Sequence, residues 1–231
     1  MTVAAILVAA GRGVRMEADR PKAFLRLGGA TLLERALRAF TSHPGIGRVV
    51  VAVQDPEEAE RQLGEAAAGV LLVRGGEERQ DSVRLALEAL GPSEADVILV
   101  HDAARPLVSR AIIDAVIAAA AKHGAAVPVL PATETVKRLA GDGRIEATLP
   151  RETLRLAQAP QGFRAAILRE AHARAARDRF AGTDDAALVE RSGMRPAAVP
   201  GSPDNMKITT PQDLLVAESL LAGSKAGETH G

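Results

Sequence analysis

The sequence predicts an α/β fold: a single domain built on a mainly parallel sheet, with a β-hairpin that protrudes as an arm. Helical stretches alternate with short apolar runs, and a chain that alternates in this way forms a parallel sheet with right-handed crossovers. Continuous apolar runs are typical of strands buried on both faces. On this basis strands are expected at residues 3–8, 49–53, 70–73, 95–101 and 125–130. No repeat or long linker divides the sequence, so we expect one domain over 1–223 and a disordered tail at 224–231.

Amphipathic periodicity and capping residues predict the helices between these strands. Thr31 can cap the first helix and Ser109 a later one, which Gly124 ends. Thr210 followed by Pro211 marks the start of the last helix. Together these signals place helices at residues 31–40, 56–68, 79–90, 109–123, 164–179, 184–191 and 210–223. Two further short strands are expected at 154–160 and 196–199.

The composition is that of an ordinary globular protein. The chain has 231 residues, of which 47% are apolar and 25% charged, and its formal net charge is zero. A zero net charge gives no support to a nucleic-acid binder. The absence of cysteine excludes disulfides, thiolate metal sites and cysteine nucleophiles. With neither a signal peptide nor an apolar run of about 18 residues, we expect a cytoplasmic protein that does not bind a membrane.

A glycine-rich loop follows the first strand. Gly11 and Gly13 let the backbone approach a ligand closely, and successive exposed N–H groups form a cradle for phosphate. Arg15 and Lys22 add two positive charges beside this loop. Met16 replaces the third glycine of the dinucleotide fingerprint, and the Gly-Lys-Ser/Thr of the ATPase loop is absent. The loop therefore indicates either a phosphate site of another kind or an ordinary tight turn.

Polar residues also follow the third and fourth strands. Gly76 and Glu77 come after the third, and Ser82 lies in the first turns of the next helix, where its hydroxyl can reach a ligand. Asp102 ends the fourth strand and Arg105 follows it. Open parallel sheets bind ligands at the carboxyl ends of their strands, where such an acid commonly holds a metal or a ribose hydroxyl. A plain loop, a turn former and a surface charge are the alternative interpretations.

The segment after the fifth strand departs from the α/β alternation. Residues around Thr135 alternate like a strand, a Gly-Asp-Gly turn at 141–143 predicts a hairpin, and residues 145–149 return. We expect this arm, at about 132–153, to cover the site or to reach a neighbouring subunit. Arg151, at the foot of the arm, is either a solvated charge or a phosphate ligand.

Further motifs carry a resemblance to a known family. They are Glu78-Arg79-x-Asp81-Ser82-Val83, His101-Asp102-Ala103-Ala104-Arg105-Pro106, Thr183-Asp184-Asp185 and Asn205-x-Lys207-Ile208-Thr209. With the glycine-rich loop, and in this order, they resemble the 2-C-methyl-D-erythritol 4-phosphate cytidylyltransferase family from residue 3 to about 214. The resemblance implies a Rossmann-like nucleotidyltransferase domain. It also implies transfer of CMP from CTP to 2-C-methyl-D-erythritol 4-phosphate, with release of pyrophosphate, in the non-mevalonate route to isoprenoids.

The resemblance implies roles for individual residues. Catalysis, by stabilising charge on the phosphates, is expected of Arg15, Lys22, Arg151 and Lys207. The CTP phosphates are expected to be bound by the backbone of Ala9, Ala10, Gly11 and Gly13. Cytosine is expected to be bound by Gly76, Glu77 and Ser82. Asp102 and Ala103 are expected to contact the ribose and the magnesium region. The polyol phosphate is expected to be bound by Arg105, Thr135, Thr183 and Arg151.

The family resemblance also implies a cofactor and a partner. The cofactor is Mg²⁺ or another divalent cation, held mainly by the CTP phosphates with Asp102 as the candidate protein ligand. The partner is a second copy of the chain, since the arm of the family reaches across a homodimer, so that Thr135 and Arg151 would serve the other subunit's site. Some relatives carry a second catalytic domain, which a chain of this length is not expected to contain.

The expected chemistry fits these residue types. The attacking group is already a phosphate anion, so the reaction needs positioning and positive charge rather than a protein nucleophile or a general base. A ribitol- or other polyol-phosphate cytidylyltransferase is the alternative enzyme, and a catalytically inactive nucleotide-binding regulator is the alternative of another class. Two positions depart from the family pattern: Glu77 stands where aspartate is common, and Ala159 where threonine is common before Pro-Gln.

Overall fold

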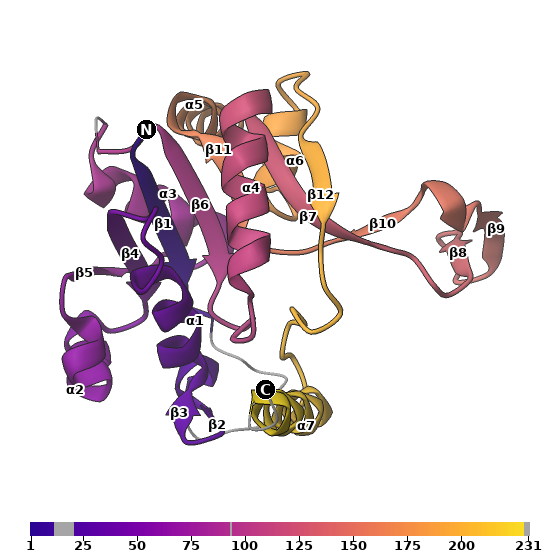
Figure 1. Cartoon of the computed structure of the whole chain (residues 1–231). Helices are drawn as coiled ribbons and strands as arrows, with labels where there is room; N and C mark the ends of the chain where they lie inside the picture. Colours follow the sequence, from indigo (N-terminus) through magenta and orange to yellow (C-terminus); the bar gives the residue numbers. More distant parts are fainter. Residues whose placement is uncertain (12–20, 93, 229–231) are drawn as a thin grey trace.

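The structure, a computed structural model, describes residues 1–11, 21–92 and 94–228, with side chains as far as residue 223. At its centre is a sheet of eight strands in which seven follow the order β10-β7-β11-β6-β1-β4-β5, and the eighth, β12, also pairs with β7 (Figure 1). The strands are β1 Val3–Val8, β4 Arg48–Val53, β5 Val70–Arg74, β6 Val97–Asp102, β7 Ala125–Pro131, β10 Arg155–Ala157, β11 Gln161–Arg164 and β12 Ala197–Pro200. Strands β5, β4, β1 and β6 pair in parallel, which confirms the predicted α/β fold with a mainly parallel sheet.

Helices cover both faces of this sheet. One face carries α1 Leu32–Thr41, α2 Pro56–Leu63 and α4 Arg110–His123, and the other carries α3 Arg79–Leu90, α5 Ala165–Asp178 and α6 Asp185–Glu190. The side chains of β1 alternate between the two cores: Leu7 packs with the first group of helices and Ile6 with the second. Burial on both faces explains why this strand reads as an uninterrupted apolar run.

Smaller elements pack at the carboxyl ends of the parallel strands. They are the short helix η2 Lys22–Phe24, the two-stranded pair β2 Arg26–Leu27 and β3 Ala30–Thr31, and the last helix, α7 Pro211–Glu228. Leu27, Leu32, Ile208 and Ala217 form a separate apolar cluster between them. Helix α7 runs past Gly223, where we expected it to end, because one interior glycine costs a helix only about 1 kcal/mol.

The segment at 154–160 differs from the single strand that the sequence predicts. The chain forms β10 beside β7, breaks, and then forms β11, which runs antiparallel between β6 and β7. Only four residues make β11, and they lack a continuous apolar run, so the pattern could not reveal a strand there. Gly162 is required in it, because a Cβ would lie 2.6 Å from Cγ1 of Val116. Helix α2 is also shorter than predicted, since the short helix η3 Gly64–Ala67 follows it.

The expected hairpin is present and protrudes. Its strands are β8 Val136–Leu139 and β9 Ile145–Leu149, which pair with each other and with no strand of the central sheet, and the turn η4 Arg151–Thr153 follows them. Figure 1 shows this arm at the end of two extended segments, well away from the body of the domain. Exposed Leu139 and Ile145 lie on it.

Candidate active site

A cavity lies at the carboxyl ends of the parallel strands. Val8 at the end of β1 pairs with Asp102 at the end of β6, and β4 and β5 lie on the other side of β1. The sheet order reverses between β1 and β6, which is where open α/β sheets bind ligands. The cavity encloses about 230 Å³. It is lined by residues 8–11, 22–23, 76–79 and 102–104 together with Ser82 and Lys207.

Ten of the sixteen residues predicted from the sequence line this cavity: Ala9, Ala10, Gly11, Lys22, Gly76, Glu77, Ser82, Asp102, Ala103 and Lys207. Gly13 and Arg15 lie outside the described residues. Arg105, Thr135, Arg151 and Thr183 are described but do not line it. The structure thus brings together five segments of the chain that are far apart in sequence. Four of them lie at the end of a strand or the start of a helix, and Lys207 lies in the loop between β12 and α7.

The backbone of the first loop is fixed by neighbouring strand ends. The Ala9 amide donates to the Ala52 carbonyl at 2.8 Å, and the Gln54 side chain donates to the Ala10 carbonyl at 3.1 Å. On the other side, the Ala103 amide donates to the Val8 carbonyl at 3.1 Å. These bonds hold the loop open to the cavity from both neighbouring strands.

The Gly-Gly pair before α3 allows close packing against the first loop. A Cβ on Gly75 would overlap the Ala10 side chain and would lie 2.8 Å from Oγ of Ser82. The Gly76 amide donates to that hydroxyl at 3.1 Å, and the hydroxyl donates to the Glu78 carbonyl at 3.1 Å. Ser82 is therefore buried and bonded within the protein, so its hydroxyl organises the wall of the cavity.

Asp102 is the electrostatic centre of the site. Its Oδ1 accepts a hydrogen bond from Nε of Arg79 at 3.0 Å, and its Oδ2 lies 2.8 Å from Nζ of Lys207. Burial acts to raise the pKa of this carboxyl, but the attraction of Arg79 and Lys207 outweighs burial and holds the pKa below its usual range. Asp102 is therefore ionised at neutral pH, with a cation on each oxygen.

Arg79 is a candidate site residue that the sequence patterns did not reveal. It stands in a quoted motif, but its partners could not be inferred from local sequence. Its Nη1 donates to Asp185 at 2.7 Å, and the other oxygen of Asp185 lies 2.9 Å from Nε2 of His172. Burial disfavours the charge of Arg79, yet Asp185 and Asp102 more than offset this and raise its pKa. The carboxyl of Asp185 keeps a lowered pKa despite burial, chiefly through Arg79.

A polar network behind the cavity positions Lys207. The Ile208 amide donates to the Ala104 carbonyl at 2.8 Å, and Arg105 Nη1 donates to the Asn205 carbonyl at 2.7 Å. Buried Asn205 in turn donates to the Ala159 carbonyl at 2.7 Å. Burial lowers the pKa of Arg105, whose Nε has no hydrogen-bond partner within the described residues. Arg105 thus anchors the segment that carries Lys207.

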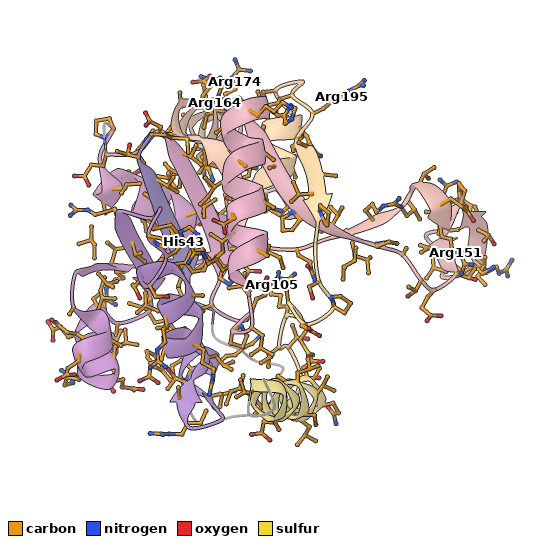
Figure 2. The ribbon with its side chains drawn as sticks, in the orientation of Figure 1. His43, Arg105, Arg151, Arg164, Arg174 and Arg195 are labelled. Carbon is orange, nitrogen blue, oxygen red and sulfur yellow. The ribbon has the colours of Figure 1, made fainter. Side chains whose placement is uncertain are left out.

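The arm residues lie far from this cavity within one chain. Figure 2 labels Arg105 in the body of the domain and Arg151 out on the arm. Arg151 is exposed, and its Nη1 donates to the Thr133 carbonyl at 2.7 Å. Thr135 on the arm and Thr183 before α6 are also exposed. A single chain therefore does not gather all of the predicted polyol-phosphate ligands.

No helix in the described part of the chain is long and apolar enough to cross a membrane.

Comparison with known proteins agrees with this geometry. Residues 3–223 match the family model of 2-C-methyl-D-erythritol 4-phosphate cytidylyltransferase. A protein of that name from Acidobacterium capsulatum is 47% identical over 96% of this chain and 98% of its own length. The bifunctional enzyme IspD/IspF of Bradyrhizobium sp. strain ORS 278 is also 47% identical, over 96% of this chain but 57% of its own length. The chain thus spans about half the length of such bifunctional relatives.

Solved structures give the same result. The 2-C-methyl-D-erythritol 4-phosphate cytidylyltransferase of Thermus thermophilus superposes with a TM-score of 0.78 at 43% identity, covering 94% of this chain and 98% of that one. The 4-diphosphocytidyl-2C-methyl-D-erythritol synthase of Anaerococcus prevotii superposes with a TM-score of 0.83 at 26% identity, covering 96% and 98%. The matched sequence and fold show that the chain belongs to the 2-C-methyl-D-erythritol 4-phosphate cytidylyltransferase family, and the strand-end cavity with its paired charges agrees with this membership.

Proposed function

We propose that the chain transfers CMP from CTP to 2-C-methyl-D-erythritol 4-phosphate, giving 4-diphosphocytidyl-2-C-methyl-D-erythritol and pyrophosphate. The observation that carries the proposal is the cavity at the sheet switch point, with Lys22, Arg79 and Lys207 on its wall and Asp102 between two of them. Family membership supplies the substrates, and the substrates are charged metabolites of the cytoplasm, where we place the protein.

The residues present suit an in-line displacement at phosphorus. A phosphate oxygen of the polyol attacks the α-phosphorus of CTP, a new P–O bond forms, and the bond to the β-phosphate bridging oxygen breaks as pyrophosphate leaves. Because the attacking oxygen already carries negative charge, the protein has to align the two phosphates and offset their repulsion. Lys22 and Lys207 line the cavity as the cations for this task, and we assign the same task to Arg15.

The donor atoms in the cavity fit a magnesium ion held largely by nucleotide. Among the described residues, no group of three or more His, Cys, Asp or Glu side chains gathers as a metal site. Asp102 offers an ionised carboxylate at the cavity wall, and Mg²⁺ is usually bound by one or two carboxylates together with substrate phosphates. When bound, the ion supplies Lewis-acid neutralisation of the phosphates. Asp102 would orient it from the protein side.

We propose that the arm completes the site of a second copy of the chain in a homodimer. The support is that Thr135 and Arg151 lie on an arm that extends away from its own cavity. Exposed apolar side chains on the arm, Leu139 and Ile145, suit contact with another subunit.

Mixing two inactive variants tests this arrangement. Arg151→Ala and Lys207→Ala should each be nearly inactive alone, whereas an equal mixture that exchanges subunits should regain roughly a quarter of the wild-type rate, since half of the dimers then hold one intact site of two. A mixture as inactive as its components would show that the arm serves its own chain, and an Arg151→Ala chain that is active alone would show that Arg151 serves no site.

The reaction itself is tested by pyrophosphate release with CTP and magnesium, comparing 2-C-methyl-D-erythritol 4-phosphate with ribitol 5-phosphate. Release with the first alone is the expected result. Release with ribitol 5-phosphate alone would keep the mechanism and change the substrate. Tight CTP binding with no release in either case would identify a nucleotide-binding regulator.

A further inference from the structure

A connected set of partly and fully buried side chains runs from the cavity wall to the helices behind it. Asp102 contacts Arg79 at 3.0 Å, Arg79 contacts Asp185 at 2.7 Å, and Asp185 contacts His172 at 2.9 Å. Arg79 and Asp102 line the cavity, whereas Asp185 and His172 lie behind Arg79 in α6 and α5. Resting on the function proposed above, we propose that Asp185 and His172 are positioning residues that fix the Arg79 guanidinium, and through it Asp102.

The geometry of Arg79 makes this role specific. Its Nε bonds to one carboxylate and its Nη1 to the other, so the planar guanidinium bridges two acids. A guanidinium held at two edges has its rotation fixed, because its donors form a rigid fork. With Asp185 removed, Arg79 would keep a single partner and could turn about that contact. Oδ1 of Asp102 would then no longer face a fixed donor.

Stability alone does not account for Asp185. Its side chain is 1% exposed, and for a buried ion pair the desolvation free energy roughly cancels the electrostatic attraction. Apolar side chains in place of such a pair are often equally stable or more so. What the pair does supply is a defined orientation of one cation at the wall of the cavity.

His172 orients Asp185 in turn. The imidazole is buried, with Nε2 facing Oδ1 of Asp185, while its Nδ1 has no hydrogen-bond partner in the described part of the chain. An N–H at Nδ1 would be a buried donor without an acceptor, so the neutral ring with its proton on Nε2 is the form that fits. That N–H holds Oδ1, which leaves Oδ2 of Asp185 to Arg79.

The start of α3 is docked to this region independently. Gln80 donates to the Phe180 carbonyl at 3.0 Å and accepts from the Gly182 amide at 3.0 Å. Changes at Asp185 or His172 therefore leave α3 attached, and their main effect falls on the orientation of Arg79.

The chain offers a matched control. His43 is another buried histidine, and its Nε2 also lies 2.9 Å from an aspartate, Asp114. This second pair joins the segment just after α1 to α4, on the other face of the sheet, and does not line the cavity. His43→Leu and His172→Leu therefore each remove a histidine–aspartate contact, and only the contact of His172 leads to the site. The two pairs differ in burial, since Asp114 is 53% exposed and Asp185 is 1% exposed.

The test measures CTP dissociation constants with magnesium, kcat and KM for each substrate, and the unfolding temperature. Asp185→Asn and His172→Leu should lower kcat/KM for CTP and weaken CTP binding, by about 10- to 100-fold, while KM for the polyol phosphate stays unchanged. His172→Gln, whose amide N–H can replace the one on Nε2, should restore CTP binding to near the wild-type value. His43→Leu should lower only the unfolding temperature and leave CTP binding and turnover unchanged.

Two outcomes would overturn the positioning role: wild-type CTP binding in both Asp185→Asn and His172→Leu, or equal loss of CTP binding in His43→Leu. The CTP titration does not depend on turnover. A wild-type chain that binds CTP but releases no pyrophosphate would refute the proposed reaction alone, and the titration of the variants would still decide the role of Asp185 and His172. A wild-type chain that does not bind CTP would refute both.

Discussion

Lys207→Ala separates the catalytic role that we propose for this residue from a structural one. Nζ of Lys207 lies 2.8 Å from Asp102, and the backbone beside it is pinned by the bond from the Ile208 amide to the Ala104 carbonyl. The ammonium is therefore preorganised at the cavity. Losing one preorganised group that stabilises developing charge costs about 2.7–4 kcal/mol in the transition state, or on the order of 100- to 1000-fold in kcat.

The same substitution should affect folding much less. The Lys207 side chain is 41% exposed, and Asp102 keeps Arg79 as a partner, so the free energy of unfolding should fall by about 1 kcal/mol or less. CTP binding should weaken but stay measurable. Pyrophosphate release and CTP titration are the assays, with urea unfolding alongside. Lys122→Ala, which removes the same charge from an exposed position at the end of α4, is the control and should behave as wild type.

A Lys207→Ala chain that releases pyrophosphate within about threefold of the wild-type rate would refute the assignment, since a preorganised cation at the reacting phosphates is worth far more than that. A large loss of turnover accompanied by an equally large loss of folded protein would refute it as well, because the effect would then be one of stability.

Further predictions concern pH, packing and the metal. Burial lowers the pKa of His101 to about 4, so between about pH 6.5 and 4 the unfolded chain binds a proton that the folded chain does not. As the pH falls through this window, the free energy of unfolding measured in urea should decrease by on the order of 3 kcal/mol, and by less in His101→Phe. Gly75→Ala should destabilise the chain by about 1–3 kcal/mol in thermal unfolding through overlap with Ala10, whereas Gly141→Ala, with open space around its Cβ, should not. A chelator should abolish pyrophosphate release, and excess Mg²⁺ should restore it; release that persists in chelator would exclude the metal.

Sequence reasoning found the parts of the site that local pattern determines. The run at 3–8 predicts a central strand because burial on both faces leaves no polar positions in it. Asp102 could be recognised because it ends such a strand, and strand ends of a parallel sheet meet at one edge. Local pattern could not reveal that Arg79 joins Asp102 to Asp185, because 106 residues separate Arg79 from Asp185 and the contact depends on how α6 packs beside α3.

The same limit explains the strand β11. A strand is recognised by apolar alternation over its length, and Gln161–Arg164 is too short to show it. Its place between β6 and β7 follows from tertiary packing, where Gly162 lets the backbone lie against Val116. Gln161 then bonds to Asp184 and to the Ala186 amide, so this inserted strand also fixes the start of α6.

The paired charges explain how the site can be stable without ligand and still bind the triphosphate of the proposed substrate. A group of cations gathered for phosphates would repel one another in the folded protein before a nucleotide arrives. Here Arg79 and Lys207 face Asp102 and Asp185, so with His172 neutral the formal charges of this cluster sum to zero. The two cations differ in exposure: Arg79 is 28% exposed and held by both acids, whereas Lys207 is 41% exposed and held by one. The phosphates of the proposed nucleotide would therefore compete most readily for Lys207, and Arg79 would stay with its two acids.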